Sequence, residues 1–254
     1  MRHLRAIVRA GMLIVVTLLM YTALILGLTL IFTFKKASQR WRGFVFQTWA
    51  KTAASILGVK VAVRGARPSL PFLLVSNHLS YVDVLVFASQ LRCVFVARGD
   101  VARWPVIGSL CRGVGTIFIN RQNRSDVTRV NGLIDQAQRD GRGVVLFAEG
   151  TSTRGDGMLP FKSSLLEPAA RANLPVAYAA ISYRTLEGEK PAHLSVCWWG
   201  EMTFVKHVIG LMYLTEIHAT VGFGAEPIQA SNRKVLAEKL WTAVSKEFLP
   251  RLSR

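Results

Sequence analysis

The sequence predicts an α/β protein with a mixed, largely parallel sheet flanked by helices, preceded by an N-terminal hydrophobic membrane helix and an amphipathic helix. Three observations support this fold class. From residue 59 onward, short apolar runs alternate with segments of helical periodicity, which is typical of helices that cover a sheet. Residues 11–34 contain no charged residue. At 254 residues and 51% hydrophobic content, the chain can form one good core.

The first element is the uncharged segment 11–34, dominated by Leu, Ile, Val, Thr and Met. As a helix it would be about 36 Å long, enough to cross about 30 Å of hydrocarbon with some tilt. A buried globular helix is rarely so long and apolar, and a signal peptide would be shorter, with small residues where Lys35 and Lys36 stand. Basic residues flank both ends, so the segment either crosses the bilayer, with its C-terminal side slightly favoured for the cytoplasm, or only enters it.

The next element is an amphipathic helix that ends before residue 59. Its apolar residues recur at helical spacing among basic residues, which suits either the headgroup level of a membrane or a helix packed on the domain. We therefore divide the chain into a membrane-anchoring helical segment, 1–58, and a globular domain, 59–254. The apolar positions of this helix are Trp41, Phe44, Val45, Thr48, Trp49 and Ile56.

The charge of the chain predicts an anionic partner. The net charge is +17, and the 82 residues before Asp83 carry eleven Lys or Arg and no carboxylate. Membrane lipids explain this better than nucleic acid, because a hydrophobic segment is present and zinc-finger and RNA-binding signatures are absent. The three cysteines, Cys93, Cys111 and Cys197, lie far apart, which suits a reduced compartment and forms no zinc pattern.

The globular domain contains several apolar runs of strand length. Helical patterns separate some of them: residues 126–138 place apolar residues on one face and end before Gly141, and residues 231–249 form a closing helix. The expected strands are 59–63, 72–75, 93–96, 116–119, 144–147, 176–181, 194–198 and 217–223.

The first polar cluster at a strand end is Asn77-His78, followed by Asp83 five residues after the histidine. Ser80 and Asp83 fit a capping box that starts a helix, so Asp83 is either only a cap or also a partner of His78. A carboxylate in the first helical turn can reach back to a ring just before the helix. It would fix the tautomer of His78 and leave the other ring nitrogen as a general base.

Two further strand ends carry polar residues. Residues 116–119 lead to Arg121, which could bind a phosphate or lie solvated at the surface. Residues 144–147 lead to Glu149-Gly150-Thr151 and then Arg154, which form either a site or an ordinary turn; Lys162 follows as a second possible anion contact. Because strand ends of a parallel sheet meet at one edge, the three clusters together favour a site.

In these residues the chain resembles the glycerolipid acyltransferase family, which includes the 1-acylglycerol-3-phosphate acyltransferases, over about residues 60–228. The N-H-x4-D block matches Asn77, His78 and Asp83, and a glycine-to-arginine block matches residues 115–121. The phenylalanine-proline-glutamate-glycine-threonine-arginine block is matched at Phe147, Glu149, Gly150 and Thr151, and a short Pro-containing strand is similar to residues 174–177.

The resemblance implies a membrane-bound O-acyltransferase whose catalytic domain is residues 59–254. It would move a fatty acyl group from acyl-CoA or acyl-carrier protein, as a co-substrate, to the free hydroxyl of a lysophospholipid, with no cofactor and no metal. The favoured acceptor is 1-acylglycerol-3-phosphate, giving phosphatidic acid. His78 is implied as the general base and Asp83 as its support. The implied substrate-binding residues are Asn77, Gly115, Arg121, Glu149, Gly150, Thr151, Arg154 and Lys162.

Two departures from the family pattern bear on the acceptor. Ala148 replaces the usual proline, and Ser152 stands where many members have a phosphate-contacting arginine. Arg154 could substitute for that arginine. The form of this block, with Asp156-Gly157 after it, is also similar to a subgroup that includes lyso-ornithine lipid acyltransferases, whose acceptor has no phosphate.

Two other readings of the sequence stay open. A non-enzymatic, basic lipid-binding protein would bind membrane surfaces without acyl transfer, and a nucleic-acid-binding protein is a more distant alternative. The expected location is the inner membrane of a bacterium, with the catalytic domain in the cytoplasm and membrane lipids as partners. The apolar tunnel that would hold the acyl chain cannot be located in the sequence.

Overall fold

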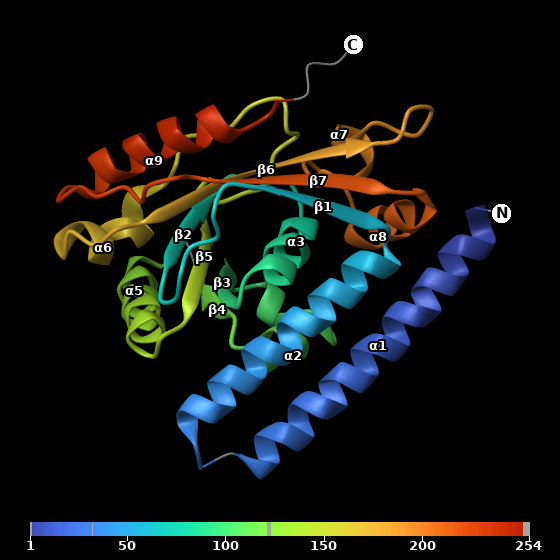
Figure 1. Cartoon of the computed structure of the whole chain (residues 1–254), viewed down its shortest axis with the longest axis horizontal. Helices are drawn as coiled ribbons and strands as arrows, with labels where there is room; N and C mark the ends of the chain where they lie inside the picture. Colours follow the sequence, from blue (N-terminus) through green and yellow to red (C-terminus); the bar gives the residue numbers. More distant parts are fainter. Residues whose placement is uncertain (1, 32, 121–122, 251–254) are drawn as a thin grey trace.

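The computed structural model describes residues 2–31, 33–120 and 123–250. In these residues a seven-stranded sheet forms the centre of the protein, with the strand order β1-β7-β6-β2-β5-β3-β4 (Figure 1). All neighbouring strands are parallel except β6 and β7, so the expected mixed, largely parallel sheet is confirmed. The strands are β1 (Val59–Arg64), β2 (Leu73–Ser76), β3 (Cys93–Arg98), β4 (Ile117–Ile119), β5 (Gly143–Phe147), β6 (Ala177–Thr185) and β7 (Ile217–Phe223).

The central strands read as continuous apolar runs because helices cover both of their faces. Every residue of β2 and β5 is buried, as expected for parallel strands inside an α/β domain. Helices α2 and α3 lie on one face and α9 on the other (Figure 1). The domain helices are α3 (Val82–Gln90), α4 (Ile107–Val114), α5 (Arg124–Arg139), α6 (Glu167–Arg171), α7 (Ala192–Ser195), α8 (Phe204–Tyr213) and α9 (Arg233–Glu247), with 3₁₀ turns at Val101–Arg103 and Ser163–Leu166.

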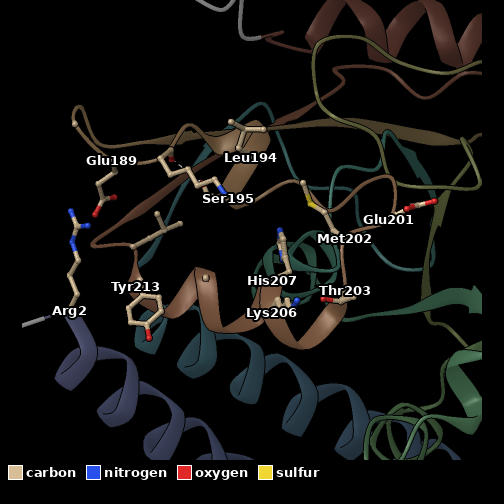
Figure 2. A pocket seen from close by; sticks show the side chains of 14 residues that line it. Arg2, Glu189, Leu194, Ser195, Glu201, Met202, Thr203, Lys206, His207 and Tyr213 are labelled. Carbon is tan, nitrogen blue, oxygen red and sulfur yellow. Dashed lines mark hydrogen bonds between the residues drawn. The ribbon is translucent and has the colours of Figure 1, made fainter.

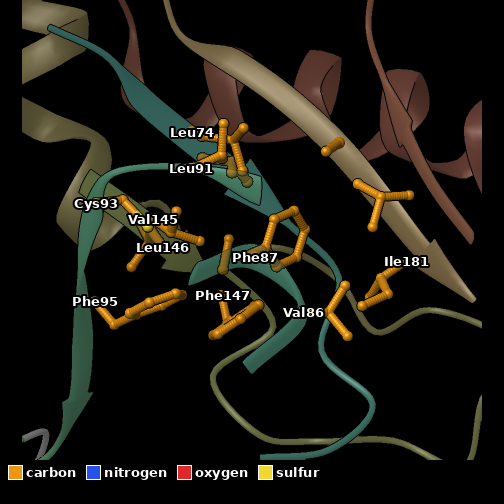
Figure 3. Packing of buried hydrophobic residues seen from close by; sticks show 14 of the residues in the cluster. Leu74, Val86, Phe87, Leu91, Cys93, Phe95, Val145, Leu146, Phe147 and Ile181 are labelled. Carbon is orange, nitrogen blue, oxygen red and sulfur yellow. The ribbon is translucent and has the colours of Figure 1, made fainter. Parts of the chain in front are cut away.

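Aromatic rings fill the core between α3 and the sheet. Phe87 of α3 points toward β2 and β5, and its ring centre is 6.0 Å from that of Phe147 at the end of β5 (Figure 3). Phe147 in turn stacks on Phe95 of β3, with ring centres 6.0 Å apart. Phe147 therefore links the core to the residues that follow β5.

The N-terminal segment forms a helical hairpin: α1 (Arg2–Leu30) and α2 (Lys35–Ile56) lie side by side (Figure 1). They approach closely at Gly27, where an added Cβ would lie 2.1 Å from Nε1 of Trp41. Further along, Trp49 Nε1 donates to Thr17 Oγ1 at 3.0 Å. α1 is long and apolar enough to cross a membrane by length and composition, with a mean hydropathy of 2.4.

The hairpin is also fixed to the domain. Ala50, Ala53 and Ala54 of α2 belong to the buried core. Arg5 and Arg9 of α1 donate to backbone carbonyl groups at the end of α8, where positive charge is favourable to the helix dipole. α1 therefore packs against the rest of the protein along one side while the other side stays exposed. Its exposed apolar residues are Leu4, Ile7, Val8, Met12, Ile14, Val15, Leu18, Leu19, Ile25, Leu26 and Leu30.

The structure corrects one expected strand. Residues 194–198 do not form a strand, because α7 spans Ala192–Ser195 and the chain leaves it without pairing to the sheet. Ser195 Oγ donates to the carbonyl oxygens of Lys190 and Pro191 and closes this helical turn. A five-residue apolar run indicates that the segment is buried, but it does not show whether the segment is a strand or a turn of helix.

Candidate active site

The site begins where β2 ends. Ser76 of β2 is paired with Phe147 of β5. The segments that follow these two strands therefore leave the sheet side by side and bring His78 and Glu149 to the same edge. Thr153 N donates to the carbonyl oxygen of His78 at 2.9 Å, which ties the two loops together. Of the three strand-end clusters expected to converge, the two at His78 and Glu149 do so, and Arg121 of the third lies outside the described residues.

His78 and Asp83 form a hydrogen-bonded pair. His78 Nδ1 is 2.7 Å from Asp83 Oδ2. The same oxygen accepts from the backbone N–H groups of Leu79, at 2.7 Å, and Ser80, at 3.0 Å. Asp83 is 0% exposed, and its carboxylate accepts from four donors in total, three at Oδ2 and one at Oδ1. Because Asp83 accepts this hydrogen bond, Nδ1 of His78 must carry the proton, which leaves Nε2 as the basic nitrogen.

The fourth donor to Asp83 is a residue that sequence reasoning missed. Tyr183, at the far end of β6, donates its hydroxyl to Asp83 Oδ1 at 2.7 Å. Burial raises the pKa of Tyr183 well above its ordinary value, and the charge of Asp83 adds to the effect. Tyr183 is therefore a neutral donor at any physiological pH. No sequence signal marks it, because it is one apolar-looking residue in a buried strand one hundred positions away.

The capping box expected from Ser80 and Asp83 is formed only in part, because the residue before helix α3 is Tyr81, which makes no side-chain capping bond. Helix α3 begins at Val82, and Asp83 reaches back to the N–H of Ser80 as in a capping box. Ser80 Oγ accepts from Val82 N at 3.3 Å instead of from Asp83 N. One carboxylate thus binds the backbone of the turn before the helix and the ring of His78, so a structural role of Asp83 and a role as partner of His78 are compatible.

The ring of His78 is fixed by packing as well. It stacks on Phe147, with ring centres 4.1 Å apart and planes 13° from parallel. Its side chain keeps 21% exposure. The histidine is therefore oriented on one side and accessible on the other, as a general base requires.

Glu149 lies behind His78. It is 1% exposed, and its two carboxylate oxygens accept from His78 N at 2.7 Å and from Leu159 N at 2.8 Å. Burial raises the pKa of Glu149 to about 7, and the two backbone hydrogen bonds partly oppose that rise. Glu149 therefore fixes the backbone at His78 and at Leu159.

Asn77 is also part of the framework. It is fully buried, and its side-chain amide forms two hydrogen bonds with the backbone of Ile181, at 3.0 and 2.8 Å. This pair fixes the end of β2 to β6. The amide of Asn77 thus supports the framework, and Asn77 is not among the residues that line the cavity containing His78.

The remaining predicted residues lie in different parts of the structure. Gly150 and Thr151 line a cavity with His78, whereas Gly115 ends α4 with a positive φ of 85°, a conformation that glycine adopts without strain. Arg121 lies outside the described residues. Arg154 lies over the ring of Trp199 and is 3.8 Å from Asp156. Neither Arg154 nor Lys162 lines the cavity that contains His78.

The apolar cavity beside His78 has a volume of about 470 Å³. It runs between the domain and the hairpin, so both helices of the N-terminal segment form part of its wall. Among the described residues that line this cavity, the cation is Arg98, and its guanidinium group is 2.8 Å from the carboxylate of Asp100. The hairpin residues of the wall are Thr17, Met20, Tyr21 and Leu24 of α1 and Val45, Phe46 and Trp49 of α2.

Comparisons with known proteins identify the family. A family model described as "Acyltransferase" matches residues 59–182. A lyso-ornithine lipid O-acyltransferase of Rhizobium meliloti is 33% identical over 217 residues, covering 80% of this chain and 74% of the relative. A 1-acyl-sn-glycerol-3-phosphate acyltransferase of Neisseria gonorrhoeae is 28% identical and covers 75% of each chain. The crystal structure of the 1-acyl-sn-glycerophosphate acyltransferase from Thermotoga maritima superposes over both full chains with a TM-score of 0.64 at 18% identity, which shows the same fold. The chain belongs to the acyltransferase family.

Proposed function

We propose that this acyltransferase moves a fatty acyl group from a thioester donor to the free hydroxyl of a lysolipid, with His78 as the general base. The observation that carries the proposal is the 2.7 Å contact between His78 Nδ1 and the buried carboxylate of Asp83. This contact leaves Nε2 available on a histidine that lines an apolar cavity. A neutral imidazole in that state suits proton removal from an alcohol.

The reaction then follows from the positions of the groups. Nε2 of His78 accepts the hydroxyl proton as the acceptor oxygen attacks the thioester carbonyl carbon. Asp83 stabilises the imidazolium through Nδ1–H. When the tetrahedral intermediate collapses, the carbon–sulfur bond breaks, and the thiolate takes the proton from Nε2. Neither a covalent acyl-enzyme nor a metal takes part in this scheme.

The side of the apolar cavity that α1 and α2 line is the proposed place of the acyl chain. Its lining is mostly aliphatic and aromatic, and each buried methylene group contributes about 0.8 kcal/mol. The donor is acyl-CoA or acyl-carrier protein, because either one presents a thioester at the end of a thin arm. The cavity wall includes α1 and α2, so the hairpin takes part in substrate binding as well as in anchoring.

The acceptor supported best is a lysolipid without phosphate, such as lyso-ornithine lipid. Ser152, at the position of the family's phosphate-contacting arginine, donates its hydroxyl to the carbonyl of Trp198, and Arg154 is turned to Trp199 and Asp156. The relative from Rhizobium meliloti carries this activity in its name. 1-Acylglycerol-3-phosphate is the second candidate, because the block at residues 115–121 matches the phosphate-binding family pattern.

The hairpin is the proposed membrane anchor. α1 exposes a row of large apolar residues, while Arg5 and Arg9 hold its beginning to α8. A helix attached along one side is suited to lie in one leaflet with its exposed side in the lipid. The proposed location is the cytoplasmic membrane of a bacterium, with the domain on the cytoplasmic side.

Acyl transfer from palmitoyl-CoA in detergent micelles tests the proposal, with lyso-ornithine lipid and 1-acylglycerol-3-phosphate as separate acceptors. The expected result is a diacylated product from at least one acceptor, and a higher kcat/KM for lyso-ornithine lipid. Salt-sensitive binding to anionic vesicles without transfer to either acceptor, from either palmitoyl-CoA or palmitoyl-carrier protein, would instead support the non-enzymatic lipid-binding reading.

A further inference from the structure

Four aromatic residues form a cluster beside His78: Tyr81, Trp104, Trp198 and Phe204. They come from four separate segments, just before α3, after the 3₁₀ turn at Val101–Arg103, after α7 and at the start of α8. Their ring centres are close, with Tyr81 and Phe204 5.0 Å apart and Trp104 and Phe204 5.1 Å apart. Neighbouring planes are inclined by 62–81°, so the rings face several directions around one space.

This cluster is not part of the closed core. Each of its four rings is only partly buried, and all four line the apolar cavity that also contains His78. Tyr81 follows His78 by three residues, and both residues line this cavity. Partly exposed rings that line a cavity are able to contact a bound molecule.

The orientation of Tyr81 is fixed from outside the cavity. Its hydroxyl is 2.8 Å from Nδ1 of His207, and Nε2 of His207 is 3.1 Å from the carbonyl oxygen of Cys197. Nε2 therefore carries the proton and Nδ1 accepts from Tyr81. His207 is 8% exposed and lines a second, outer cavity of about 590 Å³ together with Thr203 and Lys206 (Figure 2). The hydrogen bond to His207 thus holds the ring of Tyr81 in a fixed position in the wall of the apolar cavity.

The aromatic rings of the cluster suit a cationic guest. The faces of aromatic rings carry negative potential and attract ammonium groups, most strongly when water is excluded. Among the described residues that line the apolar cavity, the cation is Arg98, which Asp100 already neutralises. Among the described lining residues, a phosphate would therefore have few free cations to contact in this part of the cavity, whereas an ammonium group would have four aromatic rings to contact.

We propose that this aromatic cluster binds the ammonium group of the acceptor's head group while the acceptor hydroxyl lies at His78. The inference rests on the proposed function and deepens it, because it specifies an acceptor with a positively charged amine. Ornithine carries such a group at its δ position, in a lipid whose name occurs among the relatives. The alternative occupant of the cluster, an apolar part of either substrate, is an outcome of the test below.

Three acceptors with the same acyl chain separate charge from size. Lyso-ornithine lipid carries a δ-ammonium, its δ-N-acetyl derivative is neutral, and its δ-N-trimethyl derivative is bulky but charged. With palmitoyl-CoA as donor, we expect kcat/KM for the two charged acceptors to exceed that for the neutral one by roughly 5- to 30-fold, the range of a cation–π contact of about 1–2 kcal/mol.

Variants then locate the effect. Trp104→Leu and Phe204→Leu should each reduce the ratio of charged to neutral acceptor to less than about 3-fold. Trp241→Leu on α9 is the matched control, since Trp241 is 36% exposed and outside the cavity, and it should keep the wild-type ratio. The ratio is measured within one protein, so partial loss of folded enzyme in a variant does not alter it.

Two results would overturn the proposal. Equal kcat/KM for the charged and the neutral acceptors in the wild type would show that the cluster contacts an apolar group. A wild-type preference that persists in both Trp104→Leu and Phe204→Leu would place ammonium recognition elsewhere. Either result leaves acyl transfer itself intact, whereas acylation of none of the lysolipids, including 1-acylglycerol-3-phosphate, would contradict the proposed function.

Discussion

Tyr183→Phe removes one hydroxyl group from the site and leaves every side chain's shape almost unchanged. That hydroxyl donates to Asp83 Oδ1 at 2.7 Å, and both residues are buried. A hydrogen bond to a charged group contributes about 1.5–3 kcal/mol, and the carboxylate oxygen left behind has no water to replace it. We expect the variant to lose that amount of folding free energy, which corresponds to a fall in Tm of roughly 3–12 °C.

The same substitution should slow the chemical step. Without its Oδ1 partner, Asp83 can rotate, and the 2.7 Å contact with Nδ1 of His78 is held less well. We expect kcat to fall by about 10-fold, equivalent to about 1.4 kcal/mol, with KM for both substrates nearly unchanged because Tyr183 does not line the apolar cavity. Steady-state kinetics and thermal unfolding of the same preparation measure the two effects.

Tyr178→Phe is the matched control for this prediction. It removes the same atom from the same strand, β6, without touching Asp83, so it should change neither kcat nor Tm by a comparable amount. A Tyr183→Phe enzyme with a lower Tm but wild-type kcat would refute the reasoning, because the hydroxyl would then support the fold and not the orientation of the base.

Three further predictions concern Glu149, the hairpin and the apolar cavity. Because the folded-state pKa of Glu149 is raised to about 7, the folded protein holds its proton longer, and the free energy of unfolding should fall as pH rises from about 4.5 to 7; Glu149→Gln should flatten this slope in urea titrations at several pH values. Gly27→Ala should lower Tm, since its Cβ would meet Trp41, whereas Gly11→Ala on the same helix meets nothing within 4 Å and should not. Cys111→Trp fills part of the 470 Å³ cavity, so competition between donors should shift toward shorter acyl chains, and an unchanged profile would remove Cys111 from the acyl path.

The sequence predicted the strands of the sheet correctly where an unbroken apolar run corresponds to a strand buried on both faces. The parallel strands β2 and β5 are buried on both faces and read as unbroken apolar runs. The same reasoning placed His78, Asp83 and Glu149 at strand ends, because the carboxyl ends of parallel strands share one edge. It failed at residues 194–198, where a buried turn of helix has the same apolar content as a strand.

The rest of the site depends on contacts between distant segments. Tyr183, Trp198 and Phe204 meet the N-H-x4-D block only through the sheet order and the packing of α8, and no local pattern marks them. The cavity wall needs α1 against α2, and two side chains at that contact, Trp41 and Trp49, donate hydrogen bonds to α1. The family resemblance implied substrate binding for Glu149 and Asn77, and the structure shows both side chains bonded to the backbone.

The central claim is that His78 acts as the general base of acyl transfer. The most direct test is kcat for acyl transfer to a lysolipid by the wild type, His78→Ala and His218→Ala, the last being an exposed histidine on β7. General base catalysis contributes about 10²- to 10⁴-fold, so His78→Ala should lose at least about 100-fold in kcat while His218→Ala keeps wild-type activity. A folded His78→Ala protein with kcat within a few-fold of the wild type would contradict the account.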